Sequence, residues 1–195
     1  MFLDDIKNQV IGIDEVGRGA FSGPVVSCSI LLLKEILNFK LVNEIKDSKK
    51  LSEKKRTLLS KFIENNSVFS IGSASNREID NLNILHATNL SMIRSYEKFK
   101  NMKNLVKIDG IKTFFLNERT SFIKSGDNKS VTIAAASIMA KTWRDRLMEE
   151  YSKQYPMYGW EKNKGYGTRE HQKAIIKHGI TKLHRKTFLL KLLRC

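Results

Sequence analysis

Residues 11–19 read Ile-Gly-Ile-Asp-Glu-Val-Gly-Arg-Gly, and this stretch decides how the rest of the chain is interpreted. The apolar run 10–13 has the character of a short strand, and two carboxylates, Asp14 and Glu15, follow it directly. Sites in α/β folds are built where strands end. Neighbouring acids repel each other unless a cation lies between them, and the glycines flanking Arg18 let the backbone approach a ligand closely. Acids for a metal beside backbone donors for an anion indicate chemistry on a phosphate ester.

Two further strand-like runs also end in acids. Residues 105–108 precede Asp109, and residues 121–124 lie shortly before Asp127. Each acid has a simpler explanation, because Asp-Gly is a common turn dipeptide and an aspartate can cap a following helix. The acidic pair after the first strand is likewise typical of a solvated turn. Clustered together, however, the four carboxylates would repel one another strongly, which favours a shared metal site.

The ligand chemistry favours Mg²⁺ or Mn²⁺ over Zn²⁺, because carboxylate oxygens are hard ligands and no Cys/His cluster lies near them. Two such ions about 3.5–4 Å apart form the usual clamp for in-line displacement at phosphorus. The four histidines lack the spacing of a zinc site. We expect His86 to pack partly buried beside an apolar helix stripe. His171, His178 and His184 lie among lysines and arginines, and we expect them to be surface or substrate-contact residues.

The bulk charge points to a polyanionic partner. The 195-residue chain has 35 Lys and Arg against 20 Asp and Glu, a net charge of +15. Such an excess attracts nucleic acid first and an anionic membrane surface second. Basic RNA-coating proteins share this charge, so it does not by itself identify an enzyme. The length and the hydrophobic content of 41% indicate one domain, or one domain with an appendage.

Cysteine use and the absence of a targeting pattern lead us to expect a cytoplasmic protein. Cys28 lies inside an apolar run and Cys195 is the last residue, so no disulfide framework is expected. The N-terminus lacks the basic region of a signal peptide. No apolar stretch approaches the ~20 residues that a membrane-spanning helix needs, so no membrane partner is expected.

The pattern of apolar residues predicts an α/β fold. Strands are predicted at 10–13, 25–33, 68–74, 105–108 and 121–124, and helices at 53–64, 79–100 and 130–151. Ser52 should cap the first of these helices. The segment 17–24 should join the first two strands as a hairpin-like turn. This order of strands and helices fits a sheet with helices on its faces.

Taken in order along the chain, the motifs resemble those of ribonuclease HII over nearly the full length. The residues that carry the resemblance are Asp14-Glu15-Val16-Gly17-Arg18-Gly19, Gly23-Pro24, Asp47-Ser48-Lys49-Lys50-Leu51, Ile84-Leu85-His86-Ala87-Thr88, Asp109-Gly110, Gly126-Asp127, Ala134-Ala135-Ala136-Ser137-Ile138, Ala140-Lys141, Arg144-Asp145, and Gly165-Tyr166-Gly167-Thr168 with His171. An acidic pair alone is weakly specific, but this ordered set is highly specific. The departures from the family pattern are small and touch none of the four acids.

The resemblance implies both a fold and a metal site. The implied fold is the ribonuclease H-like α/β core, a mixed five-stranded sheet flanked by helices, within residues 1–160. Residues 161–195 would form a small, basic, helical C-terminal part that covers the minor groove of a duplex. The family's metal-holding acids match Asp14, Glu15, Asp109 and Asp127.

The resemblance also implies how a substrate is read. Gly17, Arg18 and Gly19 match the family's motif that reads the ribose 2′-hydroxyl largely through backbone groups, and this hydroxyl separates RNA from DNA. Tyr166, between two glycines, matches the family's substrate-sensing tyrosine, whose ring stacks on the deoxyribose after the ribonucleotide.

Further polar residues are expected to contact substrate phosphates. They are Ser48, Lys49 and Lys50, just before a predicted helix, and Ser137 and Lys141, four apart on one helix face. Arg144 and Arg146 are expected to be solvated or salt-bridged.

The function that the resemblance implies is endonucleolytic cleavage of RNA within RNA–DNA hybrids and at single ribonucleotides embedded in duplex DNA. The family cuts on the 5′ side of the ribonucleotide with a metal-activated water, leaving 3′-hydroxyl and 5′-phosphate ends, as ribonucleotide excision repair requires. The resemblance to this family also suggests that the protein is a monomer. Two alternatives stay open. A related type HIII enzyme would act on long hybrids, although the Gly17-Arg18-Gly19 triplet argues against it. A non-catalytic protein of this fold would bind hybrids without cutting them.

Overall fold

A mixed five-stranded sheet forms the centre of the molecule, as predicted. The computed structural model describes residues 3–46, 48, 51–190 and 192. The strands are β1 (Ile11–Val16), β2 (Val25–Leu32), β3 (Ser67–Ala74), β4 (Val106–Asp109) and β5 (Thr120–Ile123), in the order β3-β2-β1-β4-β5. β1, β2 and β3 are antiparallel neighbours, whereas β4 runs parallel to β1 and β5 runs parallel to β4. The carboxyl ends of β1, β4 and β5 therefore lie at the same end of the sheet.

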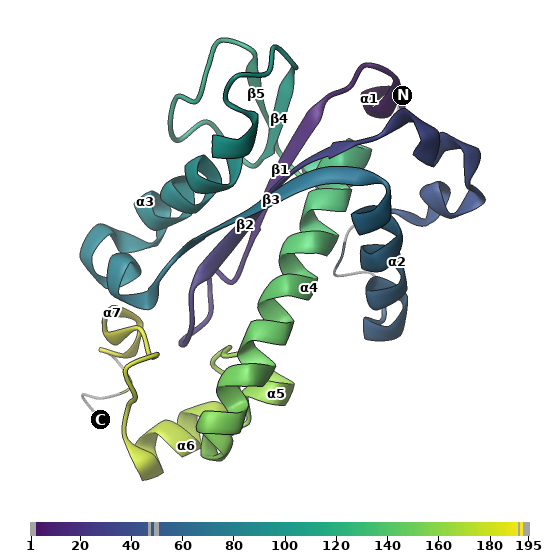
Figure 1. Cartoon of the computed structure of the whole chain (residues 1–195). Coiled ribbons are helices and arrows are strands. Elements are labelled where there is room, and N and C mark those ends of the chain that lie inside the picture. The colour runs from purple at the N-terminus through teal and green to yellow at the C-terminus, as the bar shows by residue number, and fades with distance from the viewer. Residues whose placement is uncertain (1–2, 47, 49–50, 191, 193–195) are drawn as a thin grey trace.

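Helices cover both faces of the sheet (Figure 1). α4 (Val131–Gln154) and α2 (Glu53–Asn65) pack on one face, where they share a buried apolar cluster with β2. α3 (Asn76–Tyr96) packs on the other face, where it shares a second cluster with β1 and β4. The molecule is thus a helix–sheet–helix sandwich, as the alternation of strands and helices predicted.

Two glycines let the helices approach the sheet backbone closely. A Cβ at Gly12 in β1 would lie 2.2 Å from the carbonyl carbon of Thr132 in α4. A Cβ at Gly72 in β3 would lie 2.2 Å from the carbonyl oxygen of Ser91 in α3. Only glycine permits packing at these distances, because it has no side chain to clash. The contact at Gly12 seats α4 directly against the strand that carries the two adjacent acids.

α3 is interrupted at Asn83, so the predicted helix 79–100 is not one regular helix. Asn83 has φ 66° and ψ 167°, and its Oδ1 accepts hydrogen bonds from the amides of Leu85 (2.9 Å) and His86 (3.2 Å). An asparagine side chain that caps amides in this way starts a new helical segment. His86 lies exposed in the first turn of that segment, and the prediction that it packs partly buried is wrong.

Short elements connect and cap this core. They are α1 (Asp4–Lys7), η1 (Lys34–Asn38), η2 (Lys40–Glu44), η4 (Glu97–Phe99) and η5 (Gly126–Asn128). Ser52 caps α2 through a hydrogen bond from the amide of Lys55, as predicted. Ser75 and Glu78 form a capping box at the start of α3. Among the described residues, no helix is both long and apolar enough to cross a membrane.

The C-terminal elements pack on the far half of α4. They are η6 (Pro156–Tyr158), α5 (Trp160–Asn163), α6 (Arg169–His178) and α7 (Lys186–Leu189). Tyr158, Trp160, Ile175 and Leu189 are buried together with Met148 of α4. Figure 1 shows α5 and α6 beside one end of α4, and α7 near the start of α3. The proposed boundary after residue 160 stays a prediction, and Trp160 itself belongs to the C-terminal cluster.

Candidate active site

The four predicted carboxylates lie at the ends of three neighbouring parallel strands. β1 and β4 pair in register up to the residues just before Asp14 and Asp109, so these acids come side by side. The amide of Gly126, after β5, donates a 2.7 Å hydrogen bond to Asp109 Oδ1, which brings the adjacent Asp127 to the same end of the sheet. Carboxyl ends of parallel strands are where α/β proteins build their sites.

Asp14 and Glu15 point to opposite faces of the sheet, as successive strand residues do. Asp14, 5% exposed, lies near Ser137 of α4, whose hydroxyl favours the ionised form of Asp14 and lowers its pKa. Glu15 instead lines a pocket of about 210 Å³ on the α3 side, together with Arg18 and Asp109. The acidic site therefore lies between the two helical layers and opens toward α3.

The acids at this site repel one another. Burial raises the pKa of Asp14 well above its usual range, and the negative charges of Glu15 and Asp109 raise it further. Burial also raises the pKa of Glu15, and Asp109 adds to the shift. The positive charge of Arg18 lowers the pKa of Glu15 and so partly offsets this rise. Arg18 Nη1 lies 3.4 Å from Glu15 Oε1. A cation bound among these acids would relieve the repulsion and keep all of them ionised.

The donor set fits a hard divalent cation, although the carboxylates are not yet gathered around a single point. Within the described part of the chain, no three His, Cys, Asp or Glu side chains lie close enough together to hold a metal ion. Asp14 Oδ1 accepts from the amide of Glu15 (2.7 Å), and Asp127 Oδ1 accepts from Asn128 Nδ2 (2.8 Å). Mg²⁺ and Mn²⁺ prefer all-oxygen donors. Metal binding by these acids stays a prediction, and it requires their side chains to turn toward a common centre.

A buried arginine fixes the loop that follows the acids. Arg185, fully buried, donates to the carbonyl oxygens of Gly17 (2.7 Å), Arg18 (2.8 Å) and Gly23 (2.9 Å). In a trans peptide the N–H points opposite to the C=O. Because the Gly17 and Arg18 carbonyls face Arg185, the next amides, those of Arg18 and Gly19, face away from it. Both residues are exposed, so the loop presents backbone donors toward solvent beside the acids.

Arg144 is also buried, and the prediction that it is solvated or salt-bridged is wrong. Its guanidinium donates to the carbonyl oxygens of Pro24 (2.9 Å), Ser22 (3.0 Å) and Lys164 (2.8 Å). These acceptors replace water around the charge, which permits its burial without a carboxylate. Gly17 has φ +89°, and a Cβ there would lie 2.2 Å from Arg144 Nε. Arg146 is exposed, as expected.

Tyr166 lies beside the loop after β1, and its predicted role in sensing the substrate stays a prediction. It forms an isolated β-bridge with Ala20, and the preceding Gly165 accepts a 2.8 Å hydrogen bond from the amide of Phe21. The guanidinium carbon of Arg144 lies 5.5 Å from the centre of the Tyr166 ring. Arg144 therefore links the segment 22–24 to the segment that presents Tyr166.

Two histidines support the tyrosine segment from inside, and the prediction of surface or substrate contacts for them is wrong. His171 and His184 are buried with their Nε2 atoms 3.3 Å apart. The Trp160 indole also donates to His171 Nε2 (3.0 Å), and the amide of Thr181 donates to His184 Nδ1 (2.9 Å). This network is consistent with neutral imidazoles and with donation from His171 Nδ1 to the Tyr166 carbonyl at 2.9 Å. Burial lowers the pKa of His171, and lowers that of His184 to about 4. His178 is exposed, as expected.

Two of the predicted phosphate contacts, Ser48 and Ser137, lie near Asp14. Ser48 Oγ and Ser137 Oγ are 2.9 Å apart and both residues are buried, so Ser48 is connected through Ser137 to Asp14. Lys141 forms an ion pair with Asp145, with Nζ and Oδ1 2.7 Å apart. Lys49 and Lys50 lie outside the described residues.

Sequence reasoning assigned no role to several residues that build the site. Leu85, Thr88 and Asn89 form the α3 wall of the acidic pocket. The first two belong to the motif at 84–88, which carried the resemblance without a function attached. Arg185 is one of many cations in the basic C-terminal tail, and nothing in the sequence distinguishes it from the others. Only the folded structure shows that it binds the carbonyls of the loop after β1.

Comparison with known proteins identifies relatives over nearly the whole chain. A sequence model of a family described as Ribonuclease HII matches residues 11–191. A curated protein of Pelagibacter ubique (strain HTCC1062) with that description is 48% identical over 178 residues, which cover 91% of this chain and 94% of that protein. One from Prochlorococcus marinus subsp. pastoris is 50% identical over 191 residues, covering 95% of this chain and 90% of that protein.

Solved structures share the fold at lower identity. The ribonuclease HII of Archaeoglobus fulgidus, solved in complex with PCNA, gives a TM-score of 0.75 at 24% identity, covering 91% of this chain and 94% of that chain. The ribonuclease H2 of Pyrococcus horikoshii OT3 gives 0.72 at 22% identity, covering 95% and 97%. Bst-RNase HIII, solved with Mn²⁺, gives 0.72 at 18% identity, covering 95% and 69%. These likenesses show the ribonuclease H-like fold.

Proposed function

The chain belongs to the ribonuclease HII family of metal-dependent endoribonucleases, and we propose that it cuts duplex DNA at single embedded ribonucleotides. Cleavage of the RNA strand of RNA–DNA hybrids follows from membership in the family. The proposed cut lies on the 5′ side of the ribonucleotide and leaves 3′-hydroxyl and 5′-phosphate ends. These are the products that the start of ribonucleotide excision repair requires.

The observation that supports this specificity is the loop at Gly17, Arg18 and Gly19. Arg185 holds the loop carbonyls inward, so the exposed backbone amides face outward beside Glu15. Outward amides at an exposed glycine can approach a sugar closely enough to recognise a 2′-hydroxyl, which DNA lacks. Tyr166, held against the same loop, is proposed to stack on the sugar that follows the ribonucleotide.

Asp14, Glu15, Asp109 and Asp127 are the proposed ligands of two Mg²⁺ or Mn²⁺ ions. When bound, such ions activate a water for in-line attack and stabilise the leaving oxygen. The mutual repulsion of Asp14, Glu15 and Asp109 supports this assignment, because a bound cation would relieve it while all three acids stay ionised. The similar Bst-RNase HIII was solved with Mn²⁺, which agrees with an oxygen site that takes either ion.

Substrate phosphates are proposed to contact Ser48, Lys49, Ser137 and Lys141. The support for this proposal is that Ser48 and Ser137 contact each other, with their Oγ atoms 2.9 Å apart, and that Ser137 lies close enough to Asp14 to affect its pKa. All the proposed groups come from one chain, and we propose that a monomer is active.

The metal assignment is tested with Asp14→Asn, which keeps the side-chain shape and removes the charge. Cleavage of an RNA–DNA hybrid should fall by at least about 100-fold, because the ions lose a charged ligand. Binding of the uncut hybrid should change little, and thermal unfolding should not be weakened, because a repelling charge is removed. Glu64→Gln, an exposed acid at the end of α2, is the matched control. Near wild-type cleavage by Asp14→Asn would show that the acids do not hold the metal.

A further inference from the structure

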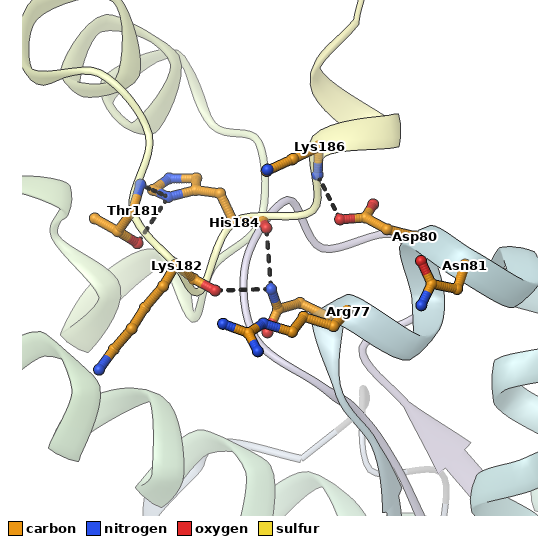
Figure 2. A pocket seen from close by; sticks show the side chains of 8 residues that line it. Arg77, Asp80, Asn81, Thr181, Lys182, His184 and Lys186 are labelled. Atoms are coloured by element: carbon orange, nitrogen blue, oxygen red, sulfur yellow. Dashed lines mark hydrogen bonds between the residues drawn. The ribbon is translucent and has the colours of Figure 1, made fainter.

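A second pocket, larger than the acidic one, lies between the start of α3 and the segment 181–186 (Figure 2). Its volume is about 450 Å³. Arg77 and Asp80 line it from α3, and Lys182 and Lys186 line it from the C-terminal part. None of these residues has a role in the proposed catalytic site.

The walls of this pocket are fixed by hydrogen bonds across the two segments. Asn76 Nδ2 donates to the carbonyl oxygens of Lys182 (2.9 Å) and His184 (3.1 Å). Asp80 accepts from the amides of Lys186 (3.0 Å) and Thr187 (3.0 Å) at the start of α7. Figure 2 shows the hydrogen bond between Lys186 and Asp80, which links the C-terminal segment to α3. A ligand would therefore meet a preformed cavity and would not have to order its walls.

The pocket carries more positive charge than its lining neutralises. Arg77, Lys182 and Lys186 are exposed, and within the described residues none of them forms a salt bridge or a side-chain hydrogen bond. The single lining carboxylate, Asp80, already accepts from two amides and from Thr187 Oγ1 (2.7 Å). Three cations around one engaged anion favour an anionic ligand. Arg and Lys side chains bind phosphate oxygens through charge-assisted hydrogen bonds.

The pocket adjoins the loop that faces the substrate. Arg185, between the lining residues His184 and Lys186, binds the carbonyls of Gly17 and Arg18. The backbone of the same segment also pairs with the end of this loop, because the amide of Gly23 donates to the Leu183 carbonyl (2.9 Å) and the amide of Arg185 donates to the Phe21 carbonyl (2.8 Å). We propose that the pocket is a subsite for a backbone phosphate of the nucleic-acid substrate, separate from the phosphate that is cut. This assignment rests on the proposed function only in taking the loop at 17–19 as a substrate-facing element.

The test compares two double variants that remove the same charge from different places. Arg77→Gln/Lys182→Gln alters the pocket, and Lys34→Gln/Lys40→Gln alters exposed lysines in η1 and η2. Binding of an uncut RNA–DNA hybrid of about 20 base pairs is measured by fluorescence anisotropy, without divalent metal and across a salt series. The pocket variant should bind about 10-fold more weakly at low salt, and the slope of log affinity against log salt should fall by roughly 1–2. The control should retain the wild-type slope.

The outcomes separate this proposal from the proposed function. Equal affinities and slopes for the two double variants would overturn the phosphate subsite, whatever the enzyme cuts. Wild-type binding by the pocket variant, together with inorganic phosphate raising the unfolding temperature of the wild type alone, would assign the pocket to a free anion and would also overturn it. Loss of affinity with an unchanged rate at saturating hybrid would support it, even if cleavage at single ribonucleotides were absent.

Discussion

Replacing Arg185 by methionine should weaken the fold and release the loop that faces the substrate. The substitution keeps an apolar stem of similar length and removes the guanidinium donors to the carbonyls of Gly17, Arg18 and Gly23, so that Gly17 keeps only the 3.4 Å hydrogen bond from the amide of Ala20. A buried acceptor left without a donor costs about 1–3 kcal/mol, so three could cost roughly 3–9 kcal/mol. Removal of a buried cation returns part of this, because Arg185 forms no salt bridge within the described residues. We therefore expect a loss near the lower end, about 3 kcal/mol.

Thermal unfolding gives the first measurement of this effect. For a chain of this size a loss of about 3 kcal/mol corresponds to a fall of roughly 6–12 °C in the unfolding midpoint. Arg146→Met is the matched control, because Arg146 is exposed on α4 and its replacement should stay within about 0.5 kcal/mol of wild type. Arg185→Lys, which keeps a charge but fewer donors, should lie between the two.

Cleavage gives a measurement that a purely structural role would not change. At a temperature where Arg185→Met is folded, cleavage at a single ribonucleotide should fall more than affinity for the uncut duplex, because the loop amides lose their fixed direction. The reasoning would be refuted if Arg185→Met unfolded at the same temperature as Arg146→Met. It would also be refuted if a destabilised Arg185→Met still distinguished ribonucleotide from deoxyribonucleotide as well as wild type does.

Three further changes test other parts of the site. Gly17→Ala should destabilise the fold by about 2–4 kcal/mol, because φ is +89° and the new Cβ would lie 2.2 Å from Arg144 Nε; an unchanged unfolding midpoint would contradict this contact. Lowering the pH from 6.5 toward 4 should reduce stability, because the pKa of His184 is lowered to about 4 and the unfolded chain takes up a proton that the folded chain does not. The loss of stability should level off below pH 4. His184→Gln should make the unfolding midpoint depend less on pH between 6.5 and 4. If the variant depends on pH as steeply as the wild type does, His184 is not the source of the effect. Tyr166→Ala should slow cleavage at a single ribonucleotide by roughly 5–100-fold, from the loss of one stacking contact, while Tyr166→Phe stays near wild type. Equal rates for the two tyrosine variants would remove the proposed sensing role.

The sheet and the placement of the acids could be predicted because both depend on local patterns. Apolar runs that end in Asp14, Asp109 and Asp127 predicted three strands with acids at their ends, and parallel pairing then puts those ends together. The strand boundaries moved by up to three residues, since β1 extends to Val16 and includes the two acids. Propensity alone does not place a strand end more accurately than this.

The buried charges could not be predicted, because their partners are far away in the sequence. Arg144 meets the carbonyl of Pro24, and Arg185 meets the carbonyl of Gly17, across separations of 120 and 168 residues. Charged residues are almost never fully buried unless paired, so a solvated surface was the reasonable prediction for Arg144. The same reason applies to the buried pair of His171 and His184, whose mutual contact depends on how the C-terminal helices pack.

The interruption of α3 illustrates a different limit. Apolar residues continue at helical spacing through the region of Asn83, so the pattern predicts one helix. The side chain of Asn83 competes with the backbone by capping the amides of Leu85 and His86, and it restarts the helix in a new direction. The residues after the break, including Leu85 and Thr88, then line the acidic pocket.

The most direct test is cleavage of an end-labelled DNA duplex that carries one ribonucleotide, with Mg²⁺ present. The same duplex with deoxyribose at that position, the same duplex with a 2′-O-methyl group there, and an RNA–DNA hybrid are the comparisons. A single cut 5′ to the ribonucleotide, with neither modified duplex cut and the hybrid cut, is the predicted result. Cleavage of the hybrid alone would contradict recognition of a single 2′-hydroxyl by the loop at 17–19, and would place the enzyme with those that need a longer stretch of RNA.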